Sequence, residues 1–102
     1  MMTLEQYDKW VKALRSDEYE QCRGQLHAKD GTHCCLGVFG IVNGREFESR
    51  KRQALLRRAM PKNCDDADFV YLNDEARKSF PEIADYADKH LLPLLQAHWR
   101  AQ

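Results

Sequence analysis

The sequence lacks any long apolar run. Its most extended apolar stretch, residues 35–42, is far shorter than the roughly 20 residues that a membrane-spanning helix requires. Residues 1–6 also lack the basic and apolar regions that are typical of a secretory signal. We therefore expect a protein that stays in the cytoplasm of the cell that makes it.

Repeats and low-complexity tracts are absent too, and five glycines and three prolines are too few to form a flexible linker. Hydrophobic residues make up 43% of the chain and charged residues 31%, a balance that is typical of folded globular proteins. A length of 102 residues allows one core of ordinary size. We expect a single globular domain that spans residues 1–102.

Cysteines are few, and their spacing fits no zinc motif. No C-x2-C or H-x3-H pair occurs among the residues with metal-binding side chains, which are Cys22, His27, His33, Cys34, Cys35 and Cys64. Disulfides are a second alternative, but the adjacent residues Cys34 and Cys35 would need different partners, and the cytoplasm keeps thiols reduced. We prefer buried thiols that pack as small hydrophobic side chains, and we predict neither a metal nor a cofactor.

The N-terminal segment has the strongest helical pattern. Thr3 and Gln6 form a capping box, and apolar residues then recur with helical spacing at Tyr7, Trp10, Val11 and Leu14. This pattern predicts a helix that ends near Arg15.

Two segments have the pattern of β structure. Residues 25–34 resemble a hairpin around the turn 29–31, because Asp-Gly suits a tight turn. Residues 68–72 resemble a strand that ends in a turn at residues 73–74. The apolar run 35–42 fits either a buried strand or a short helix, and its spacing favours the helix.

Three further helices are expected. Residues 46–60 have helix-forming composition and stop before Pro61. Ser79 and Glu82 mark the start of another helix, whose buried face should include Ile83, Tyr86, Ala87, His90 and Leu91. Pro93 opens the last one. The predicted fold class is α+β, with a small antiparallel sheet of about three strands packed with four to five helices.

Charge is balanced in total but is unevenly distributed. Residues 43–62 hold seven basic and two acidic residues, a local charge of +5. Residues 63–88 hold eight acidic and two basic residues, a local charge of −6. The two segments either neutralise each other in the fold or form separate patches of opposite sign.

The basic segment is the strongest candidate for a binding site, because guanidinium groups match phosphate oxygens in pairs. The predicted ligand-binding residues are Arg45, Arg50, Lys51, Arg52, Arg57 and Arg58, with Asn73 and Asp74 in a nearby polar turn. The alternatives are a solvated helix face, or a face paired with the acidic segment. For Asn73 and Asp74 the alternative is a turn with no further role.

Catalytic motifs are missing. The chain has no glycine-rich loop of either standard phosphate-binding spacing. A thiolate–imidazole pair between Cys34 or Cys35 and a histidine lacks a third, orienting group. His27 and His33 are also placed to face each other across the predicted hairpin. We therefore predict that the protein is not an enzyme and has no catalytic residues.

Three blocks of sequence occur in a characteristic order: W-V-K-A-L-R-S at residues 10–16, C-C-L-G-V at 34–38, and L-N-D at 72–74 followed by S-F-P-E-I-A-D-Y at 79–86. Together they resemble a group of small proteins that are common in bacteriophages and prophages. The resemblance implies a phage-encoded accessory protein inside a bacterial cell. It brings no catalytic residues with it.

The expected function is that of a binding protein that counteracts a bacterial defence system. It would sequester an anionic nucleotide signal or occlude a host protein. The alternative is a nucleic-acid-binding module that uses residues 45–62, although an isoelectric point near 6.9 is low for such a protein. A homo-oligomer is also possible, with Trp99 at the interface.

Overall fold

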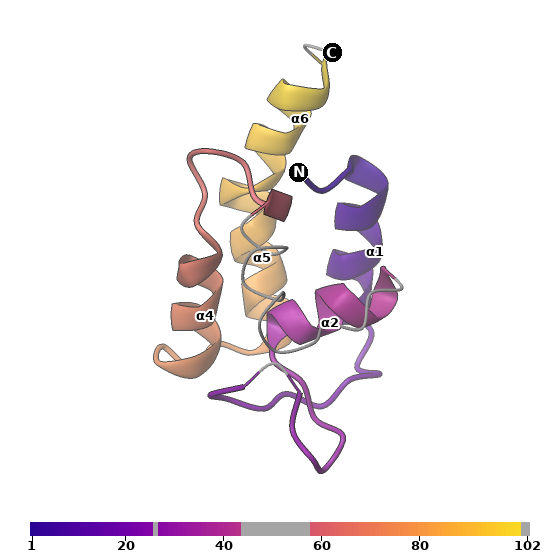
Figure 1. Ribbon diagram of the computed structural model, residues 1–102, viewed down its shortest axis with the longest axis vertical. Helices are drawn as coiled ribbons and strands as arrows, with labels where there is room; N and C mark the ends of the chain where they lie inside the picture. Colours follow the sequence, from indigo (N-terminus) through magenta and orange to yellow (C-terminus); the bar gives the residue numbers. More distant parts are fainter. Residues whose placement is uncertain (26, 44–57, 101–102) are drawn as a thin grey trace.

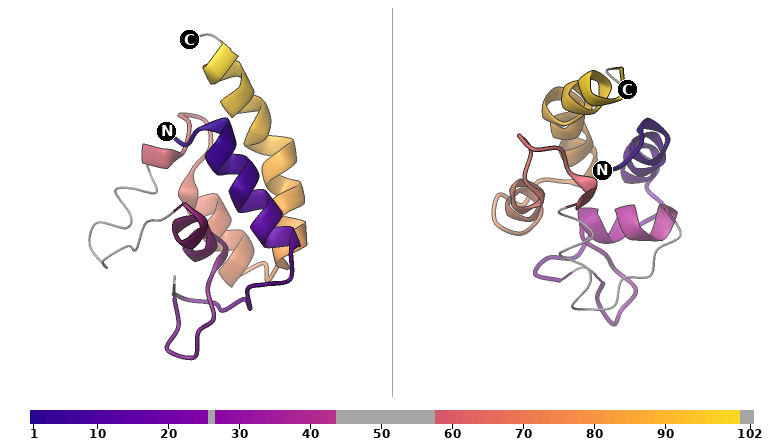
Figure 2. Two further views of the ribbon diagram at one scale, coloured as in Figure 1. Left: turned by 90° about the vertical axis from the view of Figure 1, so that its right-hand side faces the viewer. Right: turned by 45° about the horizontal axis from the view of Figure 1, so that its top comes forward.

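The computed structural model describes residues 1–25, 27–43 and 58–100 of the chain (Figure 1). The helices in these ranges are α1 (Leu4–Arg15), α2 (Cys35–Val42), α4 (Asp66–Asp74), α5 (Phe80–His90) and α6 (Leu92–Arg100). Figure 2 shows α1 alongside the column that α5 and α6 form together, and α1 contacts both of them. Helix α2 crosses the end of this arrangement and contacts α1 and α4. Within the described ranges, no helix is long and apolar enough to cross a membrane.

Helix α1 confirms the N-terminal prediction. The Thr3 side chain accepts a hydrogen bond from the Gln6 amide, and the Gln6 side chain accepts one from the Thr3 amide. This reciprocal capping satisfies two amides that have no partner inside the helix. The predicted apolar face is buried, at Tyr7, Trp10, Val11 and Leu14.

Helix α2 is an apolar helix with almost no exposed side. Its residues Cys35 to Gly40 are all buried, which confirms a helix rather than a strand for this run. The sulfur of Cys34 accepts a hydrogen bond from the Gly37 amide and caps the first turn. A helix that is hydrophobic all round belongs in the interior, and α2 lies between α1 and α4.

The strand predicted at residues 68–72 is wrong, because this segment lies in α4. Asp65 caps the helix by accepting from the Ala67 amide, and two further acidic residues in the first turn suit its positive end. Phe69 and Asn73, four residues apart, share the buried face. Residues 73–74 therefore end α4 instead of forming a turn.

The predicted hairpin at residues 25–34 contains a turn but no strands. Ala28 donates its amide to the Thr32 carbonyl, and Gly31 has a φ of 85°, which favours glycine. The described residues contain only two isolated bridges, Gln21 with His33 and His27 with His33, and no strand or sheet. The fold is all-α rather than α+β, because an isolated pair of short segments gains too little to form a sheet.

The C-terminal helices largely follow the sequence pattern. Ser79 and Glu82 form a second capping box at the start of α5. Ile83, Ala87 and Leu91 are fully buried as predicted, and Tyr86 is half-buried. His90 was predicted to be buried but is exposed, with its ring against the Tyr86 ring. The helix predicted at residues 46–60 lies almost entirely outside the described residues.

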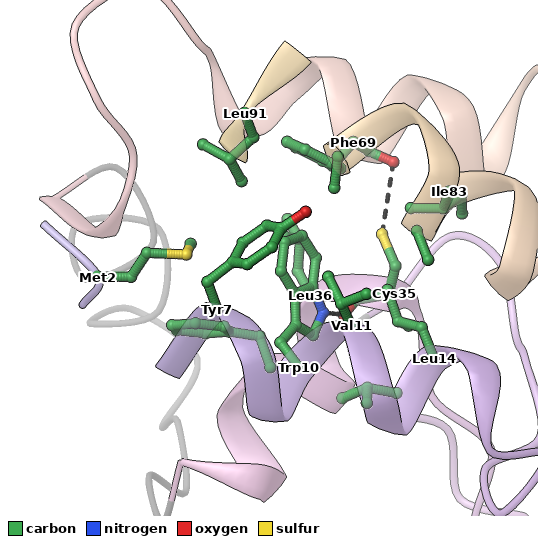
Figure 3. Packing of buried hydrophobic residues seen from close by; sticks show 14 of the residues in the cluster. Met2, Tyr7, Trp10, Val11, Leu14, Cys35, Leu36, Phe69, Ile83 and Leu91 are labelled. Carbon is green, nitrogen blue, oxygen red and sulfur yellow. Dashed lines mark hydrogen bonds between the residues drawn. The ribbon is translucent and has the colours of Figure 1, made fainter. Parts of the chain in front are cut away.

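Trp10 is the centre of the core. Its ring packs edge to face on Phe39 and Phe69, at centroid distances of 5.7 and 5.3 Å. Its indole nitrogen donates to the Cys35 carbonyl at 2.8 Å, which ties α1 to the start of α2. Figure 3 shows the Cys35 side chain beside it, with the thiol directed at the Phe69 carbonyl, 3.6 Å away. Trp10 therefore joins α1, α2 and α4.

We expect Trp10→Phe to lower the free energy of unfolding by about 2 kcal/mol, because it removes the indole hydrogen bond to the buried Cys35 carbonyl and opens a cavity. Urea unfolding followed by circular dichroism measures this loss. Trp99→Phe is the matched control, since the Trp99 indole also donates to a carbonyl, that of Met2, but from a half-buried position. Equal losses in the two variants would contradict the central role of Trp10.

Candidate functional site

The structure describes three of the eight predicted ligand-binding residues. Arg58 is exposed, while Asn73 and Asp74 lie in the last turn of α4. Five lie outside the described residues: Arg45, Arg50, Lys51, Arg52 and Arg57.

Asn73 is fully buried and uses its whole side-chain amide in hydrogen bonds within the protein. Its oxygen accepts from the Gln21 side chain at 2.8 Å and from the Cys35 amide at 3.2 Å. Its nitrogen donates to the Cys22 carbonyl and to the Asp74 carboxylate, each at 2.8 Å. An asparagine amide has two donor hydrogens and two acceptor lone pairs, so Asn73 retains no capacity for a ligand.

These bonds give Asn73 a structural role. They join the loop that precedes α2, the N-terminus of α2 and the C-terminal end of α4. The Gln21 side chain also donates to the Lys78 carbonyl, which extends the network to the segment before α5. Asn73 thus positions a loop that makes few helical or sheet hydrogen bonds of its own.

We expect Asn73→Asp to lower the free energy of unfolding by about 3 kcal/mol at neutral pH, because it removes two donors and places a buried charge beside Asp74. Part of the loss should be recovered on acidification, since protonation removes that charge. Urea unfolding at several pH values measures both effects. Asn63→Asp, at an exposed loop position, makes the same chemical change and should have little effect. Similar losses in both variants would show that burial of Asn73 is not the cause.

The thiols considered for catalysis or zinc are mostly buried. Burial raises the pKa of Cys34 to about 11 and the pKa of Cys64 to about 11, and it raises the pKa of Cys35 well above its usual range. These thiols stay protonated at neutral pH and are poor nucleophiles. His27 and His33 face each other, as expected, with their Nδ1 atoms 2.8 Å apart. Among the described residues, no three metal-binding side chains converge.

We expect iodoacetamide at pH 8 to modify Cys22 first, because it is the half-buried thiol, and to modify Cys34, Cys35 and Cys64 slowly. Peptide mass spectrometry after timed labelling identifies the modified residues. In guanidinium chloride all four should react at similar rates, which controls for sequence effects. Rapid labelling of Cys34 or Cys35 in the folded protein would restore a catalytic thiol as a candidate.

A cluster of ionised residues between α1 and α5 was not predicted from the sequence. The Arg15 guanidinium nitrogen Nη2 donates to Asp85 Oδ1 and to Asp88 Oδ2, both at 2.8 Å. The Tyr7 hydroxyl donates to Asp88 Oδ1. The spacing of Asp85 and Asp88 on one helix face was the available clue, but nothing in the sequence names Arg15 as their partner.

The electrostatics of this cluster favour a structural role, in which it holds α1 against α5, over a role as a general acid or base. Burial raises the pKa of Asp88, but the hydrogen bonds from Tyr7 and Arg15 outweigh it, so the pKa is lowered. Hydrogen bonds to Asp85 and Asp88 raise the pKa of Arg15. The pKa of Tyr7 is raised mainly by burial and, to a smaller extent, by its hydrogen bond to Asp88. All three groups keep their ordinary charge at neutral pH. They hold α1 against α5 beside a shallow groove of about 610 Å³, lined in part by Leu4, Val11 and Leu92.

These observations define a small helical protein whose buried amide, buried thiols and ionised cluster hold its own segments together. The chain belongs to the family described as Domain of unknown function (DUF8296), whose model matches residues 2–67. No curated protein and no solved structure gives a significant match. The family description names no activity, so function rests on the residues themselves.

The end of the family match does not coincide with the end of the core. Residues 2–67 include α1 and α2, but α5 and α6 lie beyond them. These two helices contribute Ile83, Ala84, Ala87, Leu91 and Leu95 to the same core cluster. Asn73 also lies beyond the match, although three of its partners lie within it. The matched segment therefore depends on the C-terminal helices for its packing.

Proposed function

We propose that this protein acts by binding an anionic partner and does not catalyse a reaction. The binding surface consists of the basic residues Arg45, Arg50, Lys51, Arg52, Arg57 and Arg58. Paired guanidinium groups suit phosphate and carboxylate oxygens. We leave Asn73 out of this surface because its hydrogen bonds are all internal.

The main support for this proposal comes from the ion pairs that residues of the acidic segment 63–88 form. Arg15 pairs with Asp85 and Asp88, and Lys78 pairs with Glu82. Neither Arg15 nor Lys78 belongs to the basic segment 43–62. Three of the eight acidic residues therefore pair with basic residues outside segment 43–62, and these three pairs support separate patches of opposite sign.

The biological setting in this proposal comes from the resemblance to phage and prophage proteins. We place the protein in the cytoplasm of a bacterial host, where it opposes a defence system, alone or as a homo-oligomer. Its ligand is an anionic nucleotide that signals infection, or an acidic surface of a host defence protein. The raised pKa values of Cys34, Cys35 and Cys64 support binding over thiol catalysis.

Nucleic acid is the second candidate ligand, since the same basic residues could follow a phosphate backbone. The near-neutral isoelectric point of about 6.9 favours a small ligand or a protein instead. The salt dependence of the affinity distinguishes nucleic acid from the other ligands. The affinity for duplex DNA falls as the salt concentration rises, with a log–log slope of about −0.9 for each phosphate neutralised.

We expect native mass spectrometry of protein purified from a bacterial cytoplasm to show a retained mass that denaturation releases and that absorbs as a nucleobase. A fluorescent cyclic dinucleotide and a fluorescent DNA duplex then serve as probes for anisotropy titrations. Removing four charges should weaken binding at least about 100-fold, because the loss of even two charge-assisted bonds at about 1.5 kcal/mol each costs about 3 kcal/mol. The variant carries the substitutions Arg50→Ala, Lys51→Ala, Arg57→Ala and Arg58→Ala.

The matched control removes the same number of positive charges from exposed lysines elsewhere, with Lys9→Ala, Lys12→Ala, Lys29→Ala and Lys89→Ala. It should keep its affinity. An equal loss of affinity in both variants would show that net charge alone explains the effect. If neither probe binds and no mass is retained, pull-down of acidic host proteins with the two variants tests the remaining target class. A partner retained equally by both variants would contradict the proposal.

A further inference from the structure

Cys22 and Cys34 occupy matching positions on two neighbouring segments of the chain. The His33 amide donates to the Glu20 carbonyl at 2.9 Å, and the Cys22 amide donates to the His33 carbonyl at 2.8 Å. These two bonds form a parallel bridge in which Gln21 lies opposite His33. In parallel pairing the next residues of the two segments are also opposite each other, and their side chains project from the same face. The register therefore places Cys22 opposite Cys34.

Asn73 holds the same two segments together on the other side of this cysteine pair. A continued parallel ladder would bring the Cys35 amide to the Cys22 carbonyl. Here the side-chain amide of Asn73 lies between these two groups, because it accepts from the Cys35 amide at 3.2 Å and donates to the Cys22 carbonyl at 2.8 Å. Cys34 itself has an extended backbone, with a φ of −83° and a ψ of 173°. Hydrogen bonds on both sides of the pair therefore fix its register.

The spacing of paired segments suits a disulfide. Neighbouring paired chains lie about 4.8 Å apart, and disulfides join residues whose Cα atoms are roughly 4.4–6.8 Å apart. The upper part of this range allows the segments to diverge where the Asn73 amide is inserted. After burial, a charge on Cys22 contributes to the raised pKa of Cys34, as expected for two sulfurs that are close in space.

The two thiols differ in their access to solvent. Cys22 is half-buried, and its sulfur donates to the Gln25 carbonyl at 3.4 Å. Cys34 is buried at the start of α2, where its sulfur accepts from the Gly37 amide. Burial raises the pKa of Cys34 to about 11, although the backbone amides at this helix terminus oppose the shift. A reagent in solvent therefore reaches Cys22 first, and Cys34 is the thiol placed to react with Cys22 afterwards.

We propose that Cys22 and Cys34 are a redox-active pair that forms a disulfide within the chain on exposure to a low-molecular-weight disulfide such as oxidised glutathione. The Cys22 thiolate attacks one sulfur of oxidised glutathione, which forms a mixed disulfide and releases one glutathione thiolate. The Cys34 thiolate then attacks the Cys22 sulfur, which closes the protein disulfide and releases the second glutathione thiolate. The two protein thiols are oxidised, and their two protons and two electrons leave with two molecules of glutathione. A disulfide that thiol exchange forms and reverses also fits the reducing interior of a cell, where disulfides are usually transient.

The other two cysteines are not placed for this reaction. Cys35 follows Cys34 directly, but its thiol points into the core and donates to the Phe69 carbonyl at 3.6 Å (Figure 3). Cys64 is buried and directly precedes Asp65, the residue that caps α4. The pairing of Cys22 should therefore be specific for Cys34.

Incubation of the folded, reduced protein with oxidised glutathione tests this pairing. Free thiols are then blocked with N-ethylmaleimide in denaturant, and peptide mass spectrometry without reduction locates the link. We expect a Cys22–Cys34 disulfide within one chain, with N-ethylmaleimide on Cys35 and Cys64, after a transient mixed disulfide at Cys22. The absence of a link, a link to another cysteine or a mixed disulfide that persists would overturn the proposal.

Two serine variants provide the controls. Cys34→Ser keeps an atom that accepts from the Gly37 amide and caps α2, and it should stop the reaction at the mixed disulfide on Cys22. Cys64→Ser removes a buried thiol elsewhere and should still form the link. An internal disulfide at Cys22 in the Cys34→Ser variant would identify a different partner and contradict the pairing.

The disulfide should also stabilise the fold, because it closes a loop of 13 residues, 22–34, that already holds the two sulfurs together. We expect oxidation to lower the equilibrium constant of unfolding in urea about 100-fold. The Cys34→Ser variant treated in the same way should show no such gain. An unchanged or larger constant in the oxidised wild type would show that the sulfurs meet only in a distorted loop, which contradicts the register of the two segments.

Discussion

The buried amide of Asn73 is the interaction on which the rest of the structure depends. An amide removed from water costs several kcal/mol unless its hydrogen bonds are replaced. Asn73 replaces all of them with groups from Gln21, Cys22, Cys35 and Asp74. These partners come from separate segments, so satisfying one side chain requires the loop, α2 and α4 to adopt their places together.

Around Asn73, apolar packing and ion pairs have different roles. Trp10 contacts α2 and α4 through its ring and its indole nitrogen, while Arg15 clamps α1 to α5 through two aspartates. The first interaction is buried and the second is partly exposed, so packing contributes most of the stability and the ion pairs contribute alignment. The loop between α1 and α2 packs Tyr19 against this core, and the hydrogen bonds of Asn73 hold it further.

Local signals in the sequence predicted the helices that they control. Capping boxes at Thr3 and Ser79 and the spacing of Tyr7, Trp10 and Leu14 were sufficient for α1 and for the start of α5, because these contacts lie within one or two turns. The segment around Phe69 was predicted as a strand and is a helix. Its short aromatic and β-branched run suits both structures, and the helix is selected by the burial of Phe69 and Asn73 against other segments.

The sequence by itself determined that the chain forms one apolar interior, where α1 and α5 start, and the separation of positive from negative segments along the chain, because these properties depend on neighbouring residues. Only the tertiary structure decided that no sheet forms among the described residues, that Asn73 is an internal connector and that burial raises the pKa of the Cys34, Cys35 and Cys64 thiols. It also placed Arg15 between Asp85 and Asp88, and His27 against His33. Each of these outcomes depends on which distant groups share a buried space, and burial sets both the cost of an unpaired polar group and the pKa of a thiol.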